Sequence, residues 1–360
     1  MNILFLSKYG RLGASSRLRT FQYIPFLSQL EIDAKVSSFI SDKQLRLKYR
    51  SGKYKYTSLC VSYFHRIADL IKSKHFDLVV IEKESLPWLP ASFEKILLRH
   101  VPYVLDYDDA VFHNYDMHPS RIVRFFWGRR LDRLMRSANL VIAGNAYLAN
   151  RAHNSGALWV EHVPTVVDIG RYALKADSPS RTALPTIVWI GSPATVHYLE
   201  LVREPLHMLS SRFPFVLRVI GASVPSFSGI KVESFAWSET SEADLIAECD
   251  IGIMPLLDTP WEQGKCGYKL IQYMACGLPV VASSVGVNSD IVLPHQNGFL
   301  ASNTNDWISA LSVLLCDEKM RRQFGLHGRS LVESRYSLQI QAPRVASLLI
   351  QTAKSGANKF

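Results

Sequence analysis

Short apolar runs alternate along this chain with longer segments in which apolar residues recur every three or four positions. In the first half the runs lie at residues 3–7, 78–82, 103–106 and 140–143, and helical spacing follows over residues 16–30 and 121–136. Strands that alternate with helices form parallel sheets covered by helices on both faces. The pattern therefore predicts a doubly wound α/β domain.

A second series of apolar runs predicts a second domain of the same class. Its strands are expected at residues 186–190, 215–220, 230–233, 251–254 and 280–282, and a polar stretch with Pro and Ser, residues 175–185, precedes them. We expect a first domain over residues 1–170, a linker over 171–185, a second domain over 186–340 and a last segment over 341–360 within an amphipathic helix. Ligands of such sheets bind beyond the carboxyl ends of the strands.

The most distinctive turn precedes the run at 280–282. Residues 264–283 read GKCGYKLIQYMACGLPVVAS, a glycine-punctuated turn followed by a helix and a strand. Free backbone N–H groups and the positive end of a helix dipole favour a phosphate group at such a turn. Lys265 and Lys269 share one helical face if the helix has begun by Lys265. The plain alternative is a solvated pair of lysines.

This run, with DIGIMPL at residues 250–256 and NGFL at 297–300, resembles the donor-binding half of glycosyltransferase family 4. The similarity covers roughly residues 185–345. It implies two Rossmann-like domains facing a cleft, the B-type fold, with a C-terminal helix that crosses back to the first domain. It also implies transfer of a sugar from a nucleotide diphosphate with retention of configuration, without a metal or other cofactor.

The resemblance extends to the turn after the first strand, GRLGASSRLR at residues 10–19. This loop faces the donor phosphates in the family, so Gly13 and Ala14 are expected near them, with Arg17 or Arg19 facing an anion. Either Ser15 or Ser16 is the expected helix cap. A plain strand-to-helix turn with surface arginines is the alternative.

Two departures from the family pattern concern charged residues. The family's basic pair after the first strand of the second domain is replaced by Gly191, Ser192 and further residues without Lys or Arg, so we assign the diphosphate to Lys265 and Lys269. The family's two glutamates, eight residues apart, are replaced by Gly264 and Gln272. Gln272 retains an amide for the ribose, and Asp258 or Glu262 is the candidate substitute for the first glutamate.

Acidic residues follow the third predicted strand, where the family approaches its acceptor. Carboxylates there orient or deprotonate a hydroxyl, and Asp109 is our candidate, with His113 nearby in sequence; Asp108 is equally a helix cap. Paired aspartates also suggest a metal, but no separate ligand cluster accompanies them.

The expected catalytic residues are thus Asp109, Lys265 and Lys269. The expected donor contacts are Gly13, Ala14, Arg17, Gly191, Ser192, Trp237, Asp258, Gly264, Gly267, Tyr268 and Gln272. For Trp237, a place beside the base and a place in the core are equally open.

The net charge of +10 lies wholly in the first half, where 26 Lys and Arg face 16 Asp and Glu. Residues 121–136 combine aromatic residues with six arginines, and residues 43–55 are also basic and carry tyrosines, which is typical of a helix that meets anionic lipid. Basic and aromatic residues also suit nucleic acid, but no nucleic-acid-binding motif accompanies them.

No leader or apolar run long enough for a membrane span is found, so a cytoplasmic protein, peripheral on the inner membrane face, is expected. The five cysteines are expected to be reduced core residues.

These observations favour a retaining transferase that moves a sugar from a UDP- or GDP-linked donor to a polysaccharide or lipid-linked glycan. The alternative is a catalytically silent nucleotide-sugar-binding subunit that supports a partner transferase. A dinucleotide-dependent oxidoreductase is disfavoured, since no GxGxxG follows a strand with an acid about 20 residues on.

Overall fold

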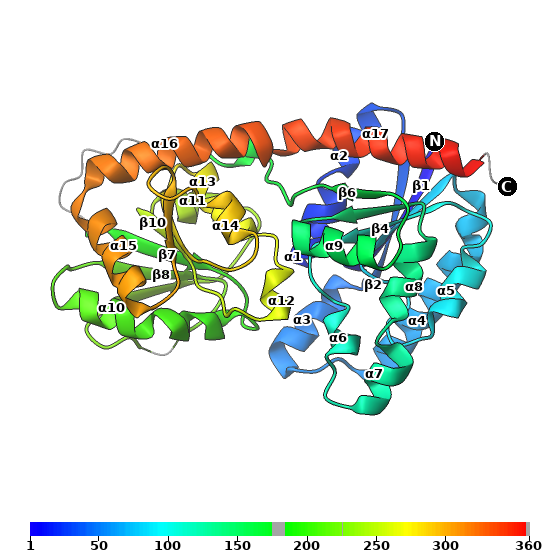
Figure 1. Ribbon diagram of the computed structural model, residues 1–360, viewed down its shortest axis with the longest axis horizontal. Coiled ribbons are helices and arrows are strands. Elements are labelled where there is room, and N and C mark those ends of the chain that lie inside the picture. Colours follow the sequence, from blue (N-terminus) through cyan, green and yellow to red (C-terminus); the bar gives the residue numbers. More distant parts are fainter. Residues whose placement is uncertain (175–183, 225, 358–360) are drawn as a thin grey trace. The chain divides into compact units, whose positions relative to one another are not determined.

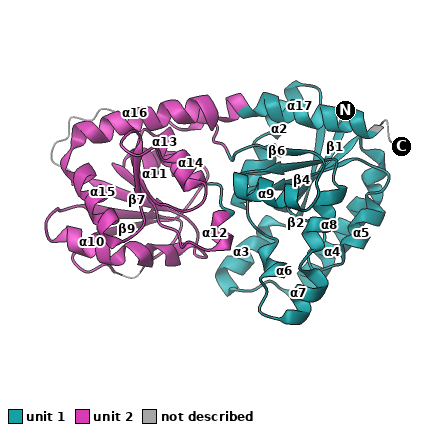
Figure 2. Cartoon of the chain, in the orientation of Figure 1, with its two compact units in different colours: residues 1–165, 264–266, 341–360 teal, residues 166–263, 267–340 magenta. Residues whose placement is uncertain are grey.

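The computed structural model describes residues 1–174, 184–224 and 226–357, which divide into two compact units (Figure 1, Figure 2). Unit 1 comprises Met1–Thr165, Gly264–Cys266 and Gln341–Phe360, and unit 2 comprises Val166–Gln263 and Gly267–Ile340. Most of the expected linker, residues 175–183, lies outside the described residues. A three-residue piece of the glycine-punctuated turn therefore packs with unit 1, although its sequence neighbours on both sides belong to unit 2.

Unit 1 contains one six-stranded parallel sheet with the order β2-β1-β3-β4-β5-β6. The central strands β3 and β4 are buried throughout, as their continuous apolar runs predict. The direction of winding reverses between β1 and β3, and the carboxyl ends of strands at such a reversal form the usual ligand site of an open sheet. The strands are β1 Asn2–Tyr9, β2 Asp33–Ile40, β3 Leu78–Glu82, β4 Tyr103–Tyr107, β5 Leu140–Ala143 and β6 Val160–His162.

Helices cover both faces of this sheet (Figure 1). They are α1 Ala14–Ser16, a π-helical turn Arg17–Phe21, α2 Ile24–Gln29, α3 Asp42–Ser51, α4 Tyr56–Lys72, a 3₁₀ turn Ser73–His75, α5 Ala91–Leu97, α6 His113–Asp116, α7 Arg121–Trp127, α8 Arg130–Ser137, α9 Ala146–Asn154 and, from Gln341 onward, α17 Leu338–Ala357.

Two predicted helices of unit 1 are interrupted, so those predictions are wrong in extent. The segment 16–30 passes through a π-helical turn, and α2 starts afresh with a proline in its first turn, where the missing N–H is tolerated. The segment 121–136 breaks at Gly128 and Arg129, and Arg129 leaves helical geometry at φ −103° and ψ 17°. The break lets α8 turn Leu131, Leu134 and Met135 into the core.

Unit 2 contains a second six-stranded parallel sheet, with the order β12-β11-β10-β7-β8-β9. This is the strand order of a dinucleotide-binding Rossmann sheet, with the reversal between β7 and β10. The strands are β7 Thr186–Ile190, β8 Val216–Ile220, β9 Lys231–Phe235, β10 Ile251–Met254, β11 Val280–Ser283 and β12 Gly298–Ala301.

The helices of unit 2 pack on both faces of its sheet, because strand residues alternate between the faces. Val188 and Ile190 belong to one apolar cluster, whereas Ile187 and Trp189 belong to another. The helical elements are two 3₁₀ segments, Ile169–Arg171 and Val196–Val202, with α10 Arg203–Ser210, α11 Glu242–Ala247, α12 Pro260–Gln263, α13 Tyr268–Ala275, α14 Asn288–Ile291, α15 Thr304–Cys316 and α16 Glu318–Arg335.

All five cysteines are free thiols. Three of them, Cys249, Cys266 and Cys276, are buried as expected. Cys60 on α4 and Cys316 at the end of α15 are exposed, so the expectation of core cysteines is wrong for these two.

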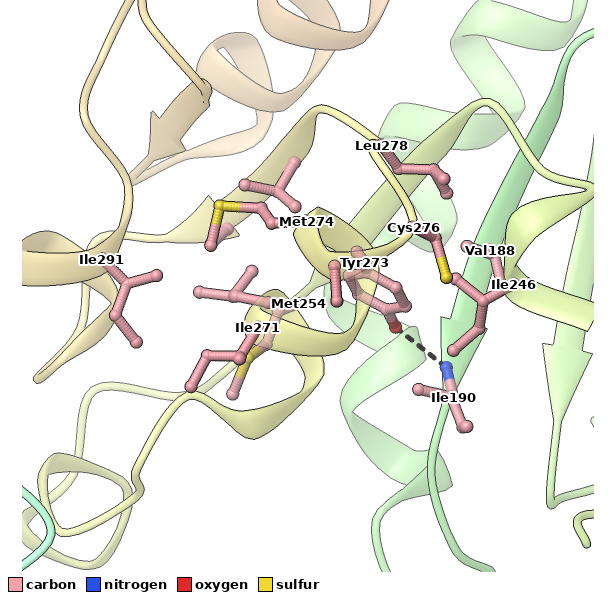
Figure 3. Packing of buried hydrophobic residues seen from close by; sticks show 14 of the residues in the cluster. Val188, Ile190, Ile246, Met254, Ile271, Tyr273, Met274, Cys276, Leu278 and Ile291 are labelled. Atoms are coloured by element: carbon pink, nitrogen blue, oxygen red, sulfur yellow. Dashed lines mark hydrogen bonds between the residues drawn. The ribbon is translucent and has the colours of Figure 1, made fainter. Parts of the chain in front are cut away.

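Tyr273 fastens α13 to two strands of unit 2, and Figure 3 shows its hydrogen bond to Ile190. Its hydroxyl accepts a hydrogen bond from the backbone N–H of Ile190 at 2.9 Å and donates one to the carbonyl of Ile253 at 3.3 Å. The side chain is fully buried among Val188, Ile271 and other apolar residues. These two hydrogen bonds therefore fix the position of α13, the helix after the glycine-punctuated turn, relative to β7 and β10.

Substitution Tyr273→Phe should lower the free energy of unfolding of unit 2 by about 1–3 kcal/mol, because the buried N–H of Ile190 loses its acceptor. Urea unfolding followed by tryptophan fluorescence measures this change. The matched control is Tyr56→Phe, which removes a phenol hydroxyl from an exposed side chain and should change stability by less than about 0.5 kcal/mol. Equal stabilities of the two variants would contradict the proposed role of the hydroxyl.

Candidate active site

The carboxyl ends of β1, β3 and β4 lie side by side, since β3 pairs with both neighbours. Each end is followed by a charged or hydroxyl residue, and one further lysine comes from the 264–266 segment of unit 1. We call the resulting group the strand-end cluster; its members are Ser15, Lys83, Asp108, Asp109 and Lys265. It lies where the winding of the sheet reverses, the position at which an open α/β sheet binds its ligand.

Lys83 is the centre of this cluster. Its Nζ lies 2.8 Å from Ser15 Oγ, 2.9 Å from Asp108 Oδ1 and 3.1 Å from Asp109 Oδ2. Ser15 also donates to Asp108 Oδ2 at 2.5 Å. Lys265 Nζ lies 3.7 Å from the other oxygen of Asp109. The Asp109 side chain is 27% exposed and that of Asp108 is 10% exposed, so Asp109 is the more accessible carboxylate of the cluster.

The backbone of Lys83 is strained to hold this position. Its φ of 63° is a left-handed conformation that costs a non-glycine residue about 1–3 kcal/mol. The backbone N–H of Lys83 donates to the carbonyl of Asp106 at 2.8 Å, which fixes the turn. Burial alone would favour the neutral amine, but Asp108 and Asp109 outweigh it and raise the pKa of Lys83 well above its usual value.

The same contacts determine the charge of Asp108. Burial of this carboxyl opposes ionisation, yet Lys83 and the hydrogen bond from Ser15 prevail and hold the pKa of Asp108 below its usual value. The helix-capping alternative for Asp108 is therefore wrong, because its carboxylate pairs with Lys83 instead. Lys83 and Asp108 thus hold each other in the charged form.

The segment Gly264–Cys266 is seated against the loops of unit 1. Asn145 donates from its side chain to the carbonyl of Lys265 at 2.8 Å, and the Cys266 thiol donates to the carbonyl of Asp108 at 3.2 Å. A Cβ at Gly264 would come within 2.7 Å of the backbone nitrogen of Ala110. No side chain fits there without moving the backbone, which explains why the glutamate expected from the family is absent.

The loop after β1 has a packing role in addition to any ligand contact. The N-cap of α1 is Gly13, not Ser15 or Ser16, so both expected caps are wrong. A Cβ at Gly13 would lie 2.3 Å from Cβ of Tyr9, so glycine is needed for close packing. Ala14, the first residue of α1, is exposed, whereas Arg17 is buried and donates to the carbonyl of Arg11 at 3.4 Å.

Arg19, the alternative anion contact, is committed to the interior of unit 1. Its guanidinium binds both oxygens of Asp106, the shortest distance being 2.6 Å, and also donates to the carbonyls of Val163 and Pro164. The expectation that Arg19 faces a ligand anion is therefore wrong. This ion pair ties the loop after β1 to the end of β4.

Glu82, at the end of β3, is a buried carboxyl beside the strand-end cluster. Its Oε2 accepts hydrogen bonds from Ser16 Oγ at 2.5 Å and from the backbone N–H of Lys8 at 3.0 Å. Within the described residues its Oε1 has no hydrogen-bond partner. Burial raises the pKa of Glu82 to about 7, despite the opposing effect of Lys83.

In unit 2, Gly191 and Ser192 follow β7 at the reversal of the sheet. The backbone N–H of Ser192 donates to Thr195 Oγ1 at 3.1 Å, and a Cβ at Gly191 would lie 2.2 Å from the ring of Trp189. The ammonium of Lys269 lies over this same ring, 4.4 Å from its centroid. Cation and aromatic face attract one another, and the contact orients the lysine.

Lys265 and Lys269 do not share a helical face, because the condition for it, a helix that has begun by Lys265, is not met. Helix α13 begins only at Tyr268, after Gly267 adopts a φ of 65° as its N-cap. A Cβ at Gly267 would lie 2.4 Å from Ile291 Cδ1, which adds a packing reason for glycine. Lys265 belongs to unit 1, and Lys269 belongs to unit 2.

Five side chains of unit 2, buried or partly buried, form a hydrogen-bond chain. Trp237 Nε1 donates to Glu242 Oε2 at 2.6 Å, and the Tyr172 hydroxyl donates to Glu242 Oε1 at 3.1 Å. Gln272 Nε2 in turn donates to the Tyr172 hydroxyl at 2.9 Å, and the hydroxyl of Tyr268 lies 3.3 Å from it. The structure thus brings together the three expected donor residues Trp237, Tyr268 and Gln272.

The candidate substitutes for the absent glutamate differ in exposure. Glu262 is buried and accepts hydrogen bonds from the hydroxyls of Tyr198 and Thr259. Asp258 is exposed and accepts a hydrogen bond from Gln263 Nε2 at 2.6 Å. Asp258 is therefore the more accessible carboxylate of this segment.

Sequence reasoning missed four residues that the structure places in these clusters: Ser15, as more than a helix cap, and Lys83, Tyr172 and Glu242. A signal existed for Lys83, because the segment Glu82–Ser85 places three charged residues directly after a buried apolar strand. No comparable signal marked Glu242, whose role depends on its distance from Trp237 and Tyr172. His113 pairs with Asp116 and Tyr147, each at 2.8 Å, and does not contact Asp109 in any hydrogen bond of the described residues.

Within the described part of the chain, no group of three or more His, Cys, Asp or Glu residues is arranged to hold a metal ion. The described helices also include none that combines the length and the apolar character of a membrane span.

A family model described as "Glycosyl transferases group 1" matches residues 185–317, so the expected glycosyltransferase domain is confirmed for this part of the chain. A curated relative, the GDP-mannose-dependent monoacylated alpha-(1-6)-phosphatidylinositol monomannoside mannosyltransferase of Corynebacterium glutamicum, is 31% identical over 84 residues. The matched segment covers 23% of this chain and 22% of that protein.

Solved structures resemble the whole chain. Sucrose-phosphate synthase from Thermosynechococcus elongatus matches with a TM-score of 0.73 and 14% identity, covering 99% of this chain and 100% of that chain. Anabaena HepE in complex with UDP-glucose matches with a TM-score of 0.70 and 16% identity, covering 98% and 100%. Together with the two parallel sheets, these likenesses confirm the predicted B-type fold of two Rossmann-like domains.

The buried carboxyl of Glu82 makes stability depend on pH. The folded chain keeps this proton up to about pH 7, whereas the unfolded chain releases it near pH 4.5, so the free energy of unfolding should fall as pH rises between these values and then level off. Glu82→Gln cannot ionise and should not share this decline. The variant should exceed the native chain by about 1–3 kcal/mol at pH 8, and the gap should narrow toward pH 5.

Urea unfolding of both proteins at pH 5, 6, 7 and 8 tests this expectation. Glu31→Gln, which makes the same exchange on an exposed turn, is the matched control. A stability difference between Glu82→Gln and the native chain that is constant over the four pH values would contradict it.

Proposed function

We propose that this chain is a retaining glycosyltransferase that moves a sugar from a UDP- or GDP-linked donor to a polysaccharide or lipid-linked glycan. The observation that carries the proposal is the glycosyl transferases group 1 match over residues 185–317, within a chain of B-type fold. Similar structures include HepE in complex with UDP and with UDP-glucose, which supports a UDP-linked donor. The name of the curated mannosyltransferase gives GDP-mannose as its donor, so the proposal also includes GDP-linked donors.

The donor contacts proposed in unit 2 follow from its two clusters. Trp237, Tyr268 and Gln272 line the nucleoside, with Gln272 held by Tyr172 so that its amide is oriented in advance. Gly191 and Ser192 are proposed to lie beside the donor phosphates at the end of β7, and Lys269 adds a positive charge at the start of α13. Gly267 begins that helix, whose positive dipole end favours phosphate. Asp258 is the proposed contact for the donor sugar, because it is the exposed carboxylate of its segment.

The contacts proposed in unit 1 use the strand-end cluster and its neighbours. Lys265 contacts the diphosphate, and Gly264 permits the close backbone packing that brings Lys265 to Asp109. Gly13 and Ala14 are proposed to approach the donor phosphates. Arg17 is retained as a supporting positive charge, although it is buried.

Asp109 is proposed to orient the acceptor hydroxyl. In the reaction, the bond between the sugar's anomeric carbon and the diphosphate oxygen breaks, and the acceptor oxygen bonds to that carbon on the same face. The acceptor proton passes to the leaving phosphate oxygen. Positioned cations lower the barrier most when they are fixed before the reaction, and Lys83 serves this arrangement by holding Asp108 and Asp109 in place.

The absence of both family glutamates supports one competing proposal, a catalytically silent subunit that binds a nucleotide sugar. Gly264 has no room for a side chain, and Gln272 is buried. The charged, strained strand-end cluster favours the enzyme, because fixed charges at a strand end cost free energy that a purely structural loop does not require.

Two substitutions should separate turnover from binding. Asp109→Asn should lower kcat by about 10²–10⁴-fold with donor affinity nearly unchanged, because a positioned acceptor contact is lost. Lys269→Ala should weaken UDP or GDP binding about 10-fold or more, since a charge-assisted contact contributes about 1.5–3 kcal/mol. Titration calorimetry measures affinity, and hydrolysis or transfer of the nucleotide sugar measures turnover.

Asp33→Asn, at the exposed start of β2, is the matched control for the carboxylate exchange. If the donor binds tightly to the native chain but neither hydrolysis nor transfer to any lipid-linked acceptor occurs, the silent-subunit proposal replaces the enzyme. Unchanged binding by Lys269→Ala would remove that lysine from the site.

We also propose that unit 1 docks on an anionic membrane surface. Helix α7 leaves Ile122, Phe125 and Phe126 exposed by 68%, 81% and 61%, and its other residues include Arg121 and Arg124. Apolar side chains beside arginines suit the boundary between lipid headgroups and acyl chains. The name of the curated relative includes a phosphatidylinositol mannoside, which supports an acceptor at such a surface.

The double substitution Phe125→Ser/Phe126→Ser should reduce binding to anionic vesicles about 10-fold or more, because each buried phenyl ring contributes about 1.5–3 kcal/mol. Binding of the native chain should also weaken as salt rises. Co-sedimentation measures both effects, with Phe93→Ser on α5 as the control for loss of one exposed ring. Equal binding to neutral and anionic vesicles, or unchanged binding by the double variant, would contradict the membrane proposal.

A further inference from the structure

A pocket of about 690 Å³ opens on unit 1 among α6, α7, α8 and α9. Five of its lining residues are arginines: Arg124, Arg129, Arg133, Arg136 and Arg151. None of them belongs to the strand-end cluster or to the donor contacts proposed above. We call this feature the arginine pocket.

Helical spacing explains why so many arginines meet there. Helix α8 contains Arg133 and Arg136, and Arg129 directly precedes it. The spacings of four and three residues place all three side chains on one face of the helix. Arg130, one position out of phase, points into the interior and pairs with Glu84 at 2.8 Å and Glu94 at 2.5 Å. The helix thus uses one arginine for stability and presents three to the pocket.

The positive charge of the pocket is only partly compensated. Its acidic lining residues are Asp116 and Asp132, and both pair with Arg151, at 2.9 Å and 2.7 Å. Five arginines and two aspartates leave an excess of three positive charges. In the part of the chain that the structure describes, no salt bridge joins a carboxylate to any of the other four arginines.

Backbone carbonyls orient two of these arginines without neutralising them. Arg136 Nε donates to the carbonyl of Ser155 at 2.9 Å, and the neighbouring Gly156 leaves room for the guanidinium, since a Cβ there would lie 3.3 Å from Arg136 Nε. Arg124 Nη1 donates to the carbonyls of His118 and Pro119 at 2.5 and 2.9 Å. Guanidinium groups gathered and oriented in this way repel one another unless an anion lies among them.

We propose that the arginine pocket binds a phosphate-bearing ligand, because planar guanidinium groups bind phosphate oxygens in pairs and several of them suit a dianion or diphosphate. The phosphate comes either from a free ligand or from a lipid headgroup; α7, which carries Arg124, also exposes the apolar residues proposed to meet the membrane. The proposal concerns binding alone and does not require that the chain be a transferase.

The test compares the native full-length chain with Arg129→Gln/Arg133→Gln in two arms. Titration calorimetry with inorganic pyrophosphate, in the presence of excess UDP and GDP to occupy a nucleotide site, examines a free ligand. Co-sedimentation with phosphatidylcholine vesicles, with and without phosphatidate, examines a lipid headgroup. The double variant should lose affinity about 10-fold or more in at least one arm, and the arm affected identifies the source.

The matched control is Arg212→Gln/Lys319→Gln, which removes two exposed positive charges from unit 2 and should bind as the native chain does. Arg133→Lys keeps the charge but loses the planar guanidinium, so its affinity should lie between those of the native chain and the double variant. Circular dichroism checks the fold of each variant. Native binding in neither arm, or binding that the pocket variant and the control lose equally, would overturn the proposal.

Discussion

The buried ammonium of Lys83 is the interaction on which the first unit's functional face depends. It joins the ends of three strands, because its partners Ser15, Asp108 and Asp109 follow β1 and β4 while Lys83 itself follows β3. A buried cation is tolerated only with close anionic partners, so each loop is constrained by the others. The left-handed backbone at Lys83 persists because these contacts hold it. Through Asp109, the same arrangement fixes Lys265 and so the 264–266 segment.

The sequence predicted most of the fold, since continuous apolar runs identify buried parallel strands. Strand β2 escaped because it lies at the sheet edge and alternates polar and apolar residues without a run, and β6 is only three residues long. Each interrupted helix carried a sequence signal, Pro25 in the first case and Gly128 in the second. The apolar residues on both sides continue the helical spacing, so the interruptions were not predicted. For the site, glycine and lysine positions could be predicted, whereas the contacts of Glu242 and Tyr172 join residues 70 positions apart. Such pairings depend on tertiary structure and have no local pattern.

The two departures from the family pattern have different physical origins. At Gly264 the constraint is space, because the backbone of Ala110 occupies the volume that a side chain would need. At Gln272 the constraint is hydrogen bonding. An amide can donate to the Tyr172 hydroxyl, which itself donates to Glu242, whereas a carboxylate at this position could only accept and would add a second negative charge near the buried Glu242. The hydrogen-bond partners around position 272 therefore favour a glutamine over a glutamate.

The assignment of Gly264–Cys266 to unit 1 bears on how the two halves of such a chain can be exchanged. A chimaera that takes its donor half from a relative would carry that relative's residues at 264–266 if the junction followed the linear sequence. Those residues would then face the foreign loops at Ala110, Gly144 and Asn145, and a glutamate at position 264 would meet the backbone of Ala110. Functional recombination therefore requires a discontinuous junction, with this tripeptide inherited together with residues 1–165. Evolutionary coupling should likewise connect it to the amino-terminal half.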